Sequence, residues 1–292
     1  MTFTLLLTDN RGALGRALEH ELEREFFKLV VPAVGEVEWS SAEAVADYIR
    51  RVDPDLIINC VGWDDIPGAQ QQKLLAVAAK HLAQACASIP LIHFSSYTVF
   101  GSDTTKSIHG EKDEPAPAND VGRAFVAAEQ AIAETLKKWI CLRVSWVIGS
   151  YGENHLTRLL NNLIGNASPM ATVSSRLRGA PTTLSDVARV AVAMAKQISC
   201  GAKNWGVMHY CSGESCTEAE FATQVIQTLQ QLMELDSDVS LAITEDLPDG
   251  EPVSAVLACR RVRDYFGIQA RAWRPSLLPL VKQWLHTYRD HD

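Results

Sequence analysis

A glycine-containing loop near the start of the chain has the residue types and spacing of a phosphate-binding turn. Asp9-Asn10-Arg11-Gly12-Ala13-Leu14-Gly15 follows a short apolar run and precedes a helical pattern. Glycines at such a loop allow a tight turn and let the backbone approach a pyrophosphate, and the helix N-terminus offers N–H groups. The loop therefore favours a dinucleotide site, although Asp9 stands where the pattern has its first glycine. A structural turn without a ligand is the alternative.

The next apolar run ends in Val30-Val31-Pro32-Ala33. In dinucleotide-binding proteins a residue at this position usually binds the adenosine ribose and so distinguishes NAD from NADP. This segment has no Asp or Glu for the ribose hydroxyls, which argues against NAD. It also has no Arg for a 2′-phosphate, so NADP is not established. Trp39, a little further on, is expected either to flank an adenine or to be part of the core.

Apolar runs alternate with helical patterns through the first half of the chain. Runs at 2–8, 28–31, 55–61, 90–94 and 140–144 are predicted strands, and segments 13–27, 42–51, 70–87 and 121–138 are predicted helices. This order predicts a doubly wound parallel sheet with ligands at the carboxyl ends of its strands. The second half predicts helices at 156–164, 184–198 and 217–233 and short strands at 208–210 and 239–243 in a smaller α/β lobe. We place the boundary at 147, with 1–147 binding nucleotide, 148–292 binding substrate, and helix 184–198 packing back on the first part.

Composition narrows the class of protein. The 292 residues are 47% hydrophobic and 21% charged, with a formal net charge of −8, which disfavours a nucleic-acid binder. No apolar run is long enough to span a membrane, and the first residues lack a basic leader, so we expect a cytoplasmic protein. The seven cysteines form no CxxC pair and predict buried thiols rather than a metal site. His93, inside a strand, is expected to be a core histidine, and His109 a solvated loop residue.

Seven segments resemble the extended short-chain dehydrogenases, most closely the dTDP-4-dehydrorhamnose reductases (RmlD-like sugar-nucleotide-binding proteins). In order along nearly the whole chain they are NRGALG, EWSSAEAVADYIRRVDPDLIINCVG, IHFSSYTVFG, EKDEPAPANDVG, LRVSWVIG, RGAPTTLSDVA and HYCSGESCTEAEFA. The resemblance implies a Rossmann-type doubly wound sheet with a C-terminal substrate lobe, an NADP(H) or NAD(H) cofactor and a nucleotide-sugar ligand.

The resemblance also implies roles for particular residues. Ser96 matches the serine that hydrogen-bonds the reacting carbonyl, but the positions of the family's proton-donating Tyr and its Lys carry Val121 and Phe125. Tyr97 is the alternative proton donor. Trp63-Asp64-Asp65-Ile66-Pro67 replaces a longer loop of the substrate site. Substrate contacts are expected from Ser95, Trp146 and Arg178, and cofactor contacts from Asn10, Arg11, Gly12, Leu14, Gly15, Trp39, Cys60, Val61 and Gly62.

Two functions follow as hypotheses. The first is a catalytically impaired member of this lineage that binds a nucleotide or sugar nucleotide, or a partner protein, and has a regulatory role. The alternative is an active NADP(H)-dependent reductase of a dTDP-4-keto-sugar that uses Ser96 and an atypical proton donor. Asp9, Val121 and Phe125 depart from the pattern at the cofactor and catalytic positions, which favours the first. A homodimer is expected by analogy with the family.

Overall fold

The structure is a computed structural model that describes residues 2–63, 69–101, 105–164, 170–235, 239–247 and 251–289. Side chains at 69–72 and 289 are not among those described. Asp64–Pro67, the replaced loop of the sequence comparison, thus lies outside the described residues.

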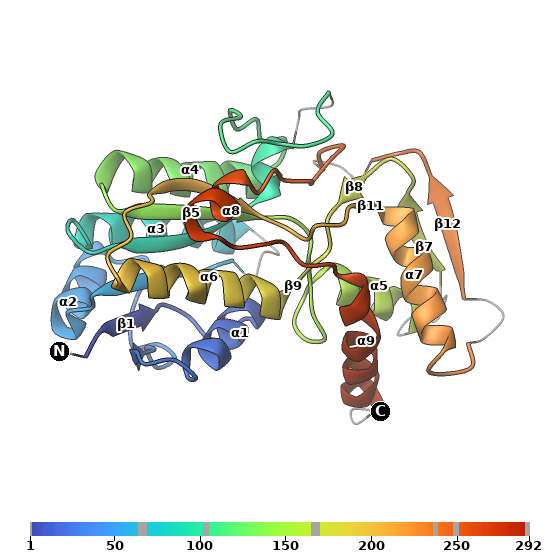
Figure 1. The fold of residues 1–292 in the computed structure, drawn as a ribbon, viewed down its shortest axis with the longest axis horizontal. Coiled ribbons are helices and arrows are strands. Elements are labelled where there is room, and N and C mark those ends of the chain that lie inside the picture. The colour runs from blue at the N-terminus through green and yellow to red at the C-terminus, as the bar shows by residue number, and fades with distance from the viewer. Residues whose placement is uncertain are drawn as a thin grey trace.

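A parallel sheet forms the centre of the larger part of the molecule (Figure 1). Across the described ranges its strand order is β10-β5-β4-β3-β1-β2, and every neighbouring pair is parallel. Most side chains on both faces of these strands are apolar and buried, which is typical of a parallel sheet covered by helices. The strands are β1 (Thr4–Leu7), β2 (Lys28–Val30), β3 (Leu56–Asn59), β4 (Leu91–Ser96), β5 (Trp139–Val144) and β10 (Gly206–Tyr210).

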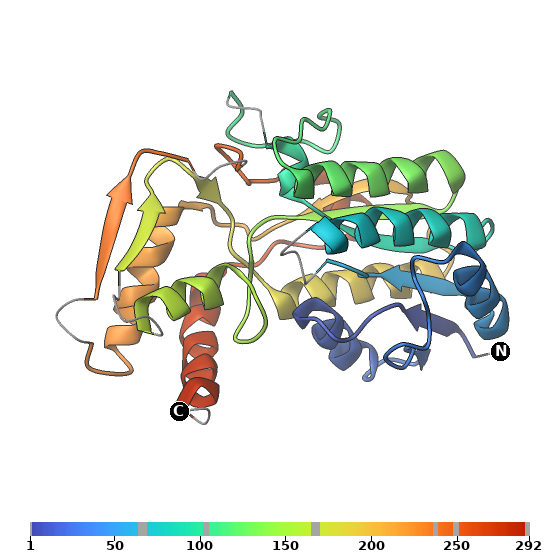
Figure 2. The same ribbon diagram turned by 180° about the vertical axis from the view of Figure 1, so that it is seen from behind.

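Helices cover the two faces of the sheet in separate layers (Figures 1 and 2). Side chains alternate along a strand, so Leu5 and Leu7 pack toward one layer and Leu6 toward the other. One layer contains α1 (Ala13–Leu22), α6 (Leu184–Ser199) and α8 (Arg260–Phe266); the other contains α2 (Ala42–Val52), α3 (Ala69–Ala85) and α4 (Asp120–Thr135). The doubly wound parallel sheet predicted from the sequence is confirmed.

A smaller lobe lies beyond the carboxyl ends of the strands (Figure 1). There β7 and β12 pair in parallel, and β8 and β11 pair antiparallel. The elements of the whole chain that have not yet been given their bounds are η1 (Tyr97–Phe100), β6 (Val147–Ile148), α5 (His155–Ile164), β7 (Met170–Ser174), β8 (Arg178–Gly179), β9 (Thr182–Thr183), β11 (Cys216–Thr217), α7 (Glu218–Gln230), β12 (Ser240–Thr244) and α9 (Arg274–Arg289).

The chain crosses between the two parts more than once. Helix α6 packs against α1, and β10 pairs with β5 in the main sheet. Helix α8 returns to the same layer through Val262 and Phe266. Strand 208–210, which the sequence analysis assigned to the second lobe, is therefore part of the main sheet.

Side-chain caps fix the starts of several helices. Asn119 and Thr183 accept backbone N–H bonds at α4 and α6, and Thr217 forms a capping box with Glu220 at α7.

Helix α1 ends at Leu22 rather than at the predicted Phe27. The chain must turn there to begin β2 at Lys28, and the side chain of Phe26 is exposed.

A buried ion pair joins helix α4 to the sheet. The Arg143 guanidinium on β5 donates to both carboxylate oxygens of Glu129 on α4, at 2.8 and 2.5 Å. The Ser95 hydroxyl on β4 also donates to Glu129, at 2.5 Å, and Arg143 lies 3.5 Å from His209 on β10. Three strands and one helix therefore meet at this one ion pair.

The end of β3 is held by a buried polar network. Asn59 accepts from the Thr8 hydroxyl at 3.0 Å and donates to His93 Nδ1 at 2.9 Å. His93 is buried, and burial lowers its pKa to about 4, so the ring is neutral near pH 7. His93 is thus a core residue, although its Nε2 has no hydrogen-bond partner among the residues that the structure describes.

His109 differs from its sequence prediction. The prediction that His109 is solvated is wrong, because its ring is fully buried and stacks on Phe100 with 4.3 Å between ring centroids. His109 Nε2 lies 3.0 Å from the Ser254 carbonyl oxygen, far along the chain. Long-range contacts of this kind leave no local sequence pattern.

Over the ranges that the structure describes, no helix is both long and apolar enough to cross a membrane.

Replacing Glu129 with alanine is expected to destabilise the protein strongly. The Arg143 charge would stay buried without its partner, which typically costs about 3–5 kcal/mol. Denaturant unfolding measures the loss. The control is Asp47→Ala, which breaks the exposed Arg50–Asp47 pair and should cost less than about 1 kcal/mol. Equal losses in the two variants would contradict the role given to the buried pair.

Stability should fall as the pH falls from about 6.5 to about 4. In that window the unfolded His93 binds a proton, since its ordinary pKa is 6.5, whereas the folded residue does not until its pKa of about 4. A histidine of this kind makes stability rise by about 1.4 kcal/mol per pH unit across the window. Urea unfolding of wild type and His93→Gln from pH 7 to 4.5 measures it. The variant should show the shallower slope; parallel curves would contradict this assignment.

Candidate active site

A cavity of about 390 Å³ opens at the carboxyl ends of the strands, between the sheet and the smaller lobe. Its position is that of ligand sites in open α/β sheets. It is lined by Ala13, Trp63, Ser96, Tyr97, Thr98, Asn119, Val121, Phe125, Ser145, Val147, Glu153, Asn154, His155, Arg158, Leu184 and Glu251.

Helix α4 places Val121 and Phe125 in the wall of this cavity. Asn119 caps the helix by accepting from the Gly122 N–H at 2.8 Å. Gly122 packs against the Thr98 carbonyl so closely that any side chain there would overlap it. The two lining residues are apolar, and Phe125 is only 2% exposed. This wall therefore offers neither a proton donor nor a cation.

Ser96 and Tyr97 both line the cavity, and their role near a reacting carbonyl stays a prediction. The Ser96 Oγ accepts the Thr98 N–H at 3.2 Å, which fixes the side chain at the start of η1. Burial, together with the nearby carboxylate of Glu251, raises the pKa of Tyr97 well above its ordinary value. The phenol therefore keeps its proton near pH 7.

The three predicted substrate contacts are not among the lining residues. Ser95 is fully buried and bonded to Glu129, and Arg178 reaches the Ser215 hydroxyl at 3.3 Å. Trp146 is 1% exposed; it packs against Gly179 and stacks on His155, with 5.2 Å between ring centroids. Trp146 thus lies behind the cavity wall and supports a residue that lines it.

Several polar lining residues come from the smaller lobe, and the sequence analysis did not identify them. They include His155 and Arg158 on α5, and Glu251 on the segment before α8. Burial lowers the pKa of His155 to about 3 and raises that of Glu251. These residues carry no motif, and only the folding of the second lobe over the sheet brings them together.

The first loop is built as a tight turn. A side chain at Gly15 would overlap the backbone of Asp9 and Asn10, and Gly12 caps α1 without a side-chain bond. Asp9 pairs with the Arg11 guanidinium at 2.7 Å and accepts the Arg11 N–H at 2.9 Å. The Asp9 charge is therefore balanced within the loop.

A second cavity, of about 220 Å³, lies between this loop and the end of β2. Arg11 and Trp39 line it together with Asp9, and residues 32–35 form its outer edge. Trp39 is 7% exposed, so it belongs to the core as well as to this wall. The position corresponds to the adenosine end of a dinucleotide site.

Other predicted cofactor residues shape the loops instead of lining this cavity. Leu14 and Val61 are buried in the core, and Cys60 Sγ contacts the Asp9 carbonyl at 3.0 Å. Gly62 has a positive φ of 73°, which a turn after β3 requires. Asn10 donates to Glu19 at 3.0 Å.

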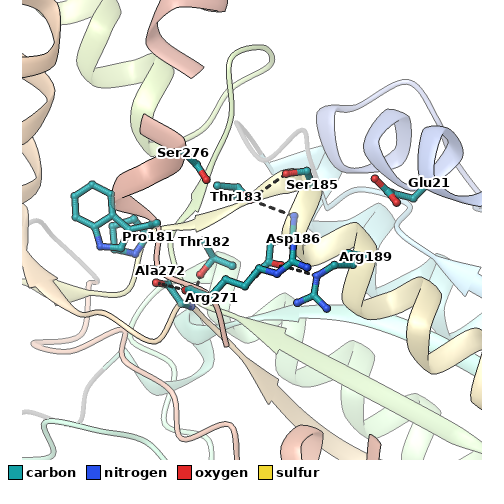
Figure 3. A pocket seen from close by; sticks show the side chains of 12 residues that line it. Glu21, Pro181, Thr182, Thr183, Ser185, Asp186, Arg189, Arg271, Ala272 and Ser276 are labelled. Carbon is teal, nitrogen blue, oxygen red and sulfur yellow. Dashed lines mark hydrogen bonds and ion pairs between the residues drawn. The ribbon is translucent and has the colours of Figure 1, made fainter. Parts of the chain in front are cut away.

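A third cavity, of about 300 Å³, lies where α6 begins and the chain enters α9 (Figure 3). Asp186 lies between Arg189, at 2.8 Å, and Arg271, at 3.7 Å, and accepts from the Tyr210 hydroxyl. The one carboxylate interacts with both guanidinium groups, so we interpret this network as a connection between the two parts.

Within the described part of the chain, no group of three or more His, Cys, Asp or Glu residues is arranged to hold a metal ion.

Known proteins resemble the chain over nearly its full length. A dTDP-4-dehydrorhamnose reductase from Sinorhizobium fredii is 26% identical over 290 residues, covering 95% of this chain and 96% of the relative. The solved structure of a dTDP-4-dehydrorhamnose reductase from Bacillus anthracis in complex with NADP has a TM-score of 0.80 at 22% identity, covering 97% and 99% of the chains. The structure of MoeE5 in complex with UDP-glucuronic acid and NAD has a TM-score of 0.77 at 18% identity, covering 97% and 99%. The RmlD substrate binding domain model matches residues 3–286, and the chain belongs to that family.

Proposed function

We propose that this protein binds a nucleotide or sugar nucleotide in the cleft and has lost most reductase activity, so that it serves as a binding or regulatory protein. The observation that carries the proposal is the apolar wall formed by Val121 and Phe125. Reduction of a carbonyl creates an alkoxide, which needs a proton donor near neutrality. Val121 and Phe125 have no proton to give, while the cavity itself remains large enough for a small molecule.

The residues fit only one end of a nicotinamide dinucleotide. The cavity beside Arg11 and Trp39 suits an adenosine, and the loop of Gly12 and Gly15 suits a phosphate. A bound nicotinamide would supply a hydride, but Phe125 presents a hydrocarbon ring where the family resemblance places the lysine that holds the nicotinamide ribose. We therefore derive no redox step for this chain.

The competing proposal is an active NADP(H)-dependent reductase of a dTDP-4-keto-sugar. Ser96 and Tyr97 line the cavity, which favours it. Against it, the pKa of Tyr97 is raised by burial and by Glu251, whereas a donor tuned to neutral pH needs a cation to lower it. The names of the relatives support the reductase lineage, and measured turnover distinguishes the two proposals.

Binding without turnover is the expected result for the wild-type protein. A dTDP-sugar such as dTDP-glucose should raise the Tm, because a ligand at 100 times its Kd adds about 2.7 kcal/mol of stability. NADPH and NADH are tested in parallel, and their oxidation is followed with a dTDP-4-keto-sugar present. Steady reduction of that sugar by the wild type would overturn the proposed loss of reductase activity. Absence of a Tm shift with every nucleotide would overturn the binding role.

Restoring the two missing groups should restore chemistry. The double variant Val121→Tyr with Phe125→Lys is expected to raise keto-sugar reduction by about 10²–10⁴-fold, the usual contribution of a positioned acid. Ala127→Lys, on the exposed side of α4, is the matched control and should leave the rate unchanged. Circular dichroism verifies the fold of each variant. A folded double variant that binds NADPH and remains inactive would mean that other parts of the site have also changed.

A further inference from the structure

The cavity at the strand ends is lined by both apolar and polar side chains. The sheet side contributes the apolar Ala13, Val121, Phe125, Val147 and Leu184, and also the polar Ser96, Tyr97, Thr98, Asn119 and Ser145. The smaller lobe contributes polar and charged side chains, among them Glu153, His155, Arg158 and Glu251. A pyranose ring has the matching character, because its C–H face is apolar and its rim carries hydroxyl donors.

Glu251 has a buried carboxylate oxygen that no described residue satisfies. The Tyr97 hydroxyl lies within hydrogen-bonding reach of the Glu251 carboxylate. The Glu251 Oε2 atom is buried and has no hydrogen-bond partner among the residues that the structure describes. A buried unpaired acceptor costs about 1–3 kcal/mol, and more when it is charged, so a ligand donor at this point would gain free energy.

The charges around the cavity disfavour a bare diphosphate near this oxygen. Glu153 and Glu251 line the cavity, and Arg158 is the one cation among the lining residues that the structure describes. Glu218 lies close enough to Arg158 and Glu251 to interact with both. A terminal phosphate would be repelled by these carboxylates, whereas an uncharged sugar rim would donate to them.

We infer that Glu251 accepts hydrogen bonds from the sugar hydroxyls of a sugar nucleotide, and that it selects a glycosylated nucleotide over the nucleoside diphosphate. The inference rests on the proposed binding function and adds the group that is recognised. The Tyr97 hydroxyl orients the carboxylate, and the apolar wall receives the C–H face of the sugar.

The test compares dTDP-glucose with dTDP by calorimetric titration of the full chain. Wild type should bind dTDP-glucose more tightly than dTDP, and Glu251→Gln should reduce that preference by about tenfold, because a charged acceptor is replaced by a neutral amide. Glu245→Gln removes the same charge from an exposed position six residues earlier in the chain and should keep the wild-type preference. An unchanged preference in a folded Glu251→Gln variant would overturn the inference.

A second measurement needs no substitution in the protein. Each hydroxyl of the dTDP-glucose sugar is replaced in turn by fluorine, which cannot donate, and at least one analogue should bind wild type about tenfold more weakly. Analogues that all bind like dTDP-glucose would refute recognition by Glu251 while leaving the nucleotide-binding proposal intact. A wild type that binds neither dTDP nor dTDP-glucose would refute the proposed function itself.

Discussion

The buried pair of Arg143 and Glu129 is the interaction on which the site depends most directly. It ties helix α4 to β5, and through Ser95 it ties the same helix to β4. Removing two charges from water is costly, so such a pair is stable only when its hydrogen bonds are satisfied, as they are here. The consequence is positional: the start of α4 is held beside the carboxyl end of β4, where Val121 and Phe125 meet Ser96 at one cavity.

Close backbone packing and helix caps build the framework around the cleft. The tight turn at Gly15, the Asn119 cap and the close approach of Gly122 to Thr98 maintain the loops around the cleft. The proposed loss of reductase activity rests on Val121 and Phe125, which present hydrocarbon to the cleft. Such side chains are compatible with the fold, because stability comes from the apolar layers on each side of the sheet.

An acidic group lies at each end of the cleft, in a different environment. Asp9 neutralises Arg11 at one end, and at the other Glu251 has a carboxylate oxygen without a hydrogen-bond partner among the described residues. A site arranged in this way favours ligand groups that donate hydrogen bonds over ligand groups that carry negative charge. The proposed preference for a sugar nucleotide rests on this arrangement.

The sequence by itself determined the alternating strands and helices of the first half and the parallel sheet, but it did not indicate β7 or α9. The predicted elements follow from hydrophobic periodicity, and the positions of Val121 and Phe125 follow from a gap-free match to a motif; both are local properties. Only the tertiary structure decided that Ser95 bonds Glu129, that Trp146 lies behind His155, that β10 joins the main sheet, and that Glu251 faces Tyr97. These contacts join residues far apart in the chain, and burial and hydrogen-bond geometry at such distances leave no signal in local spacing.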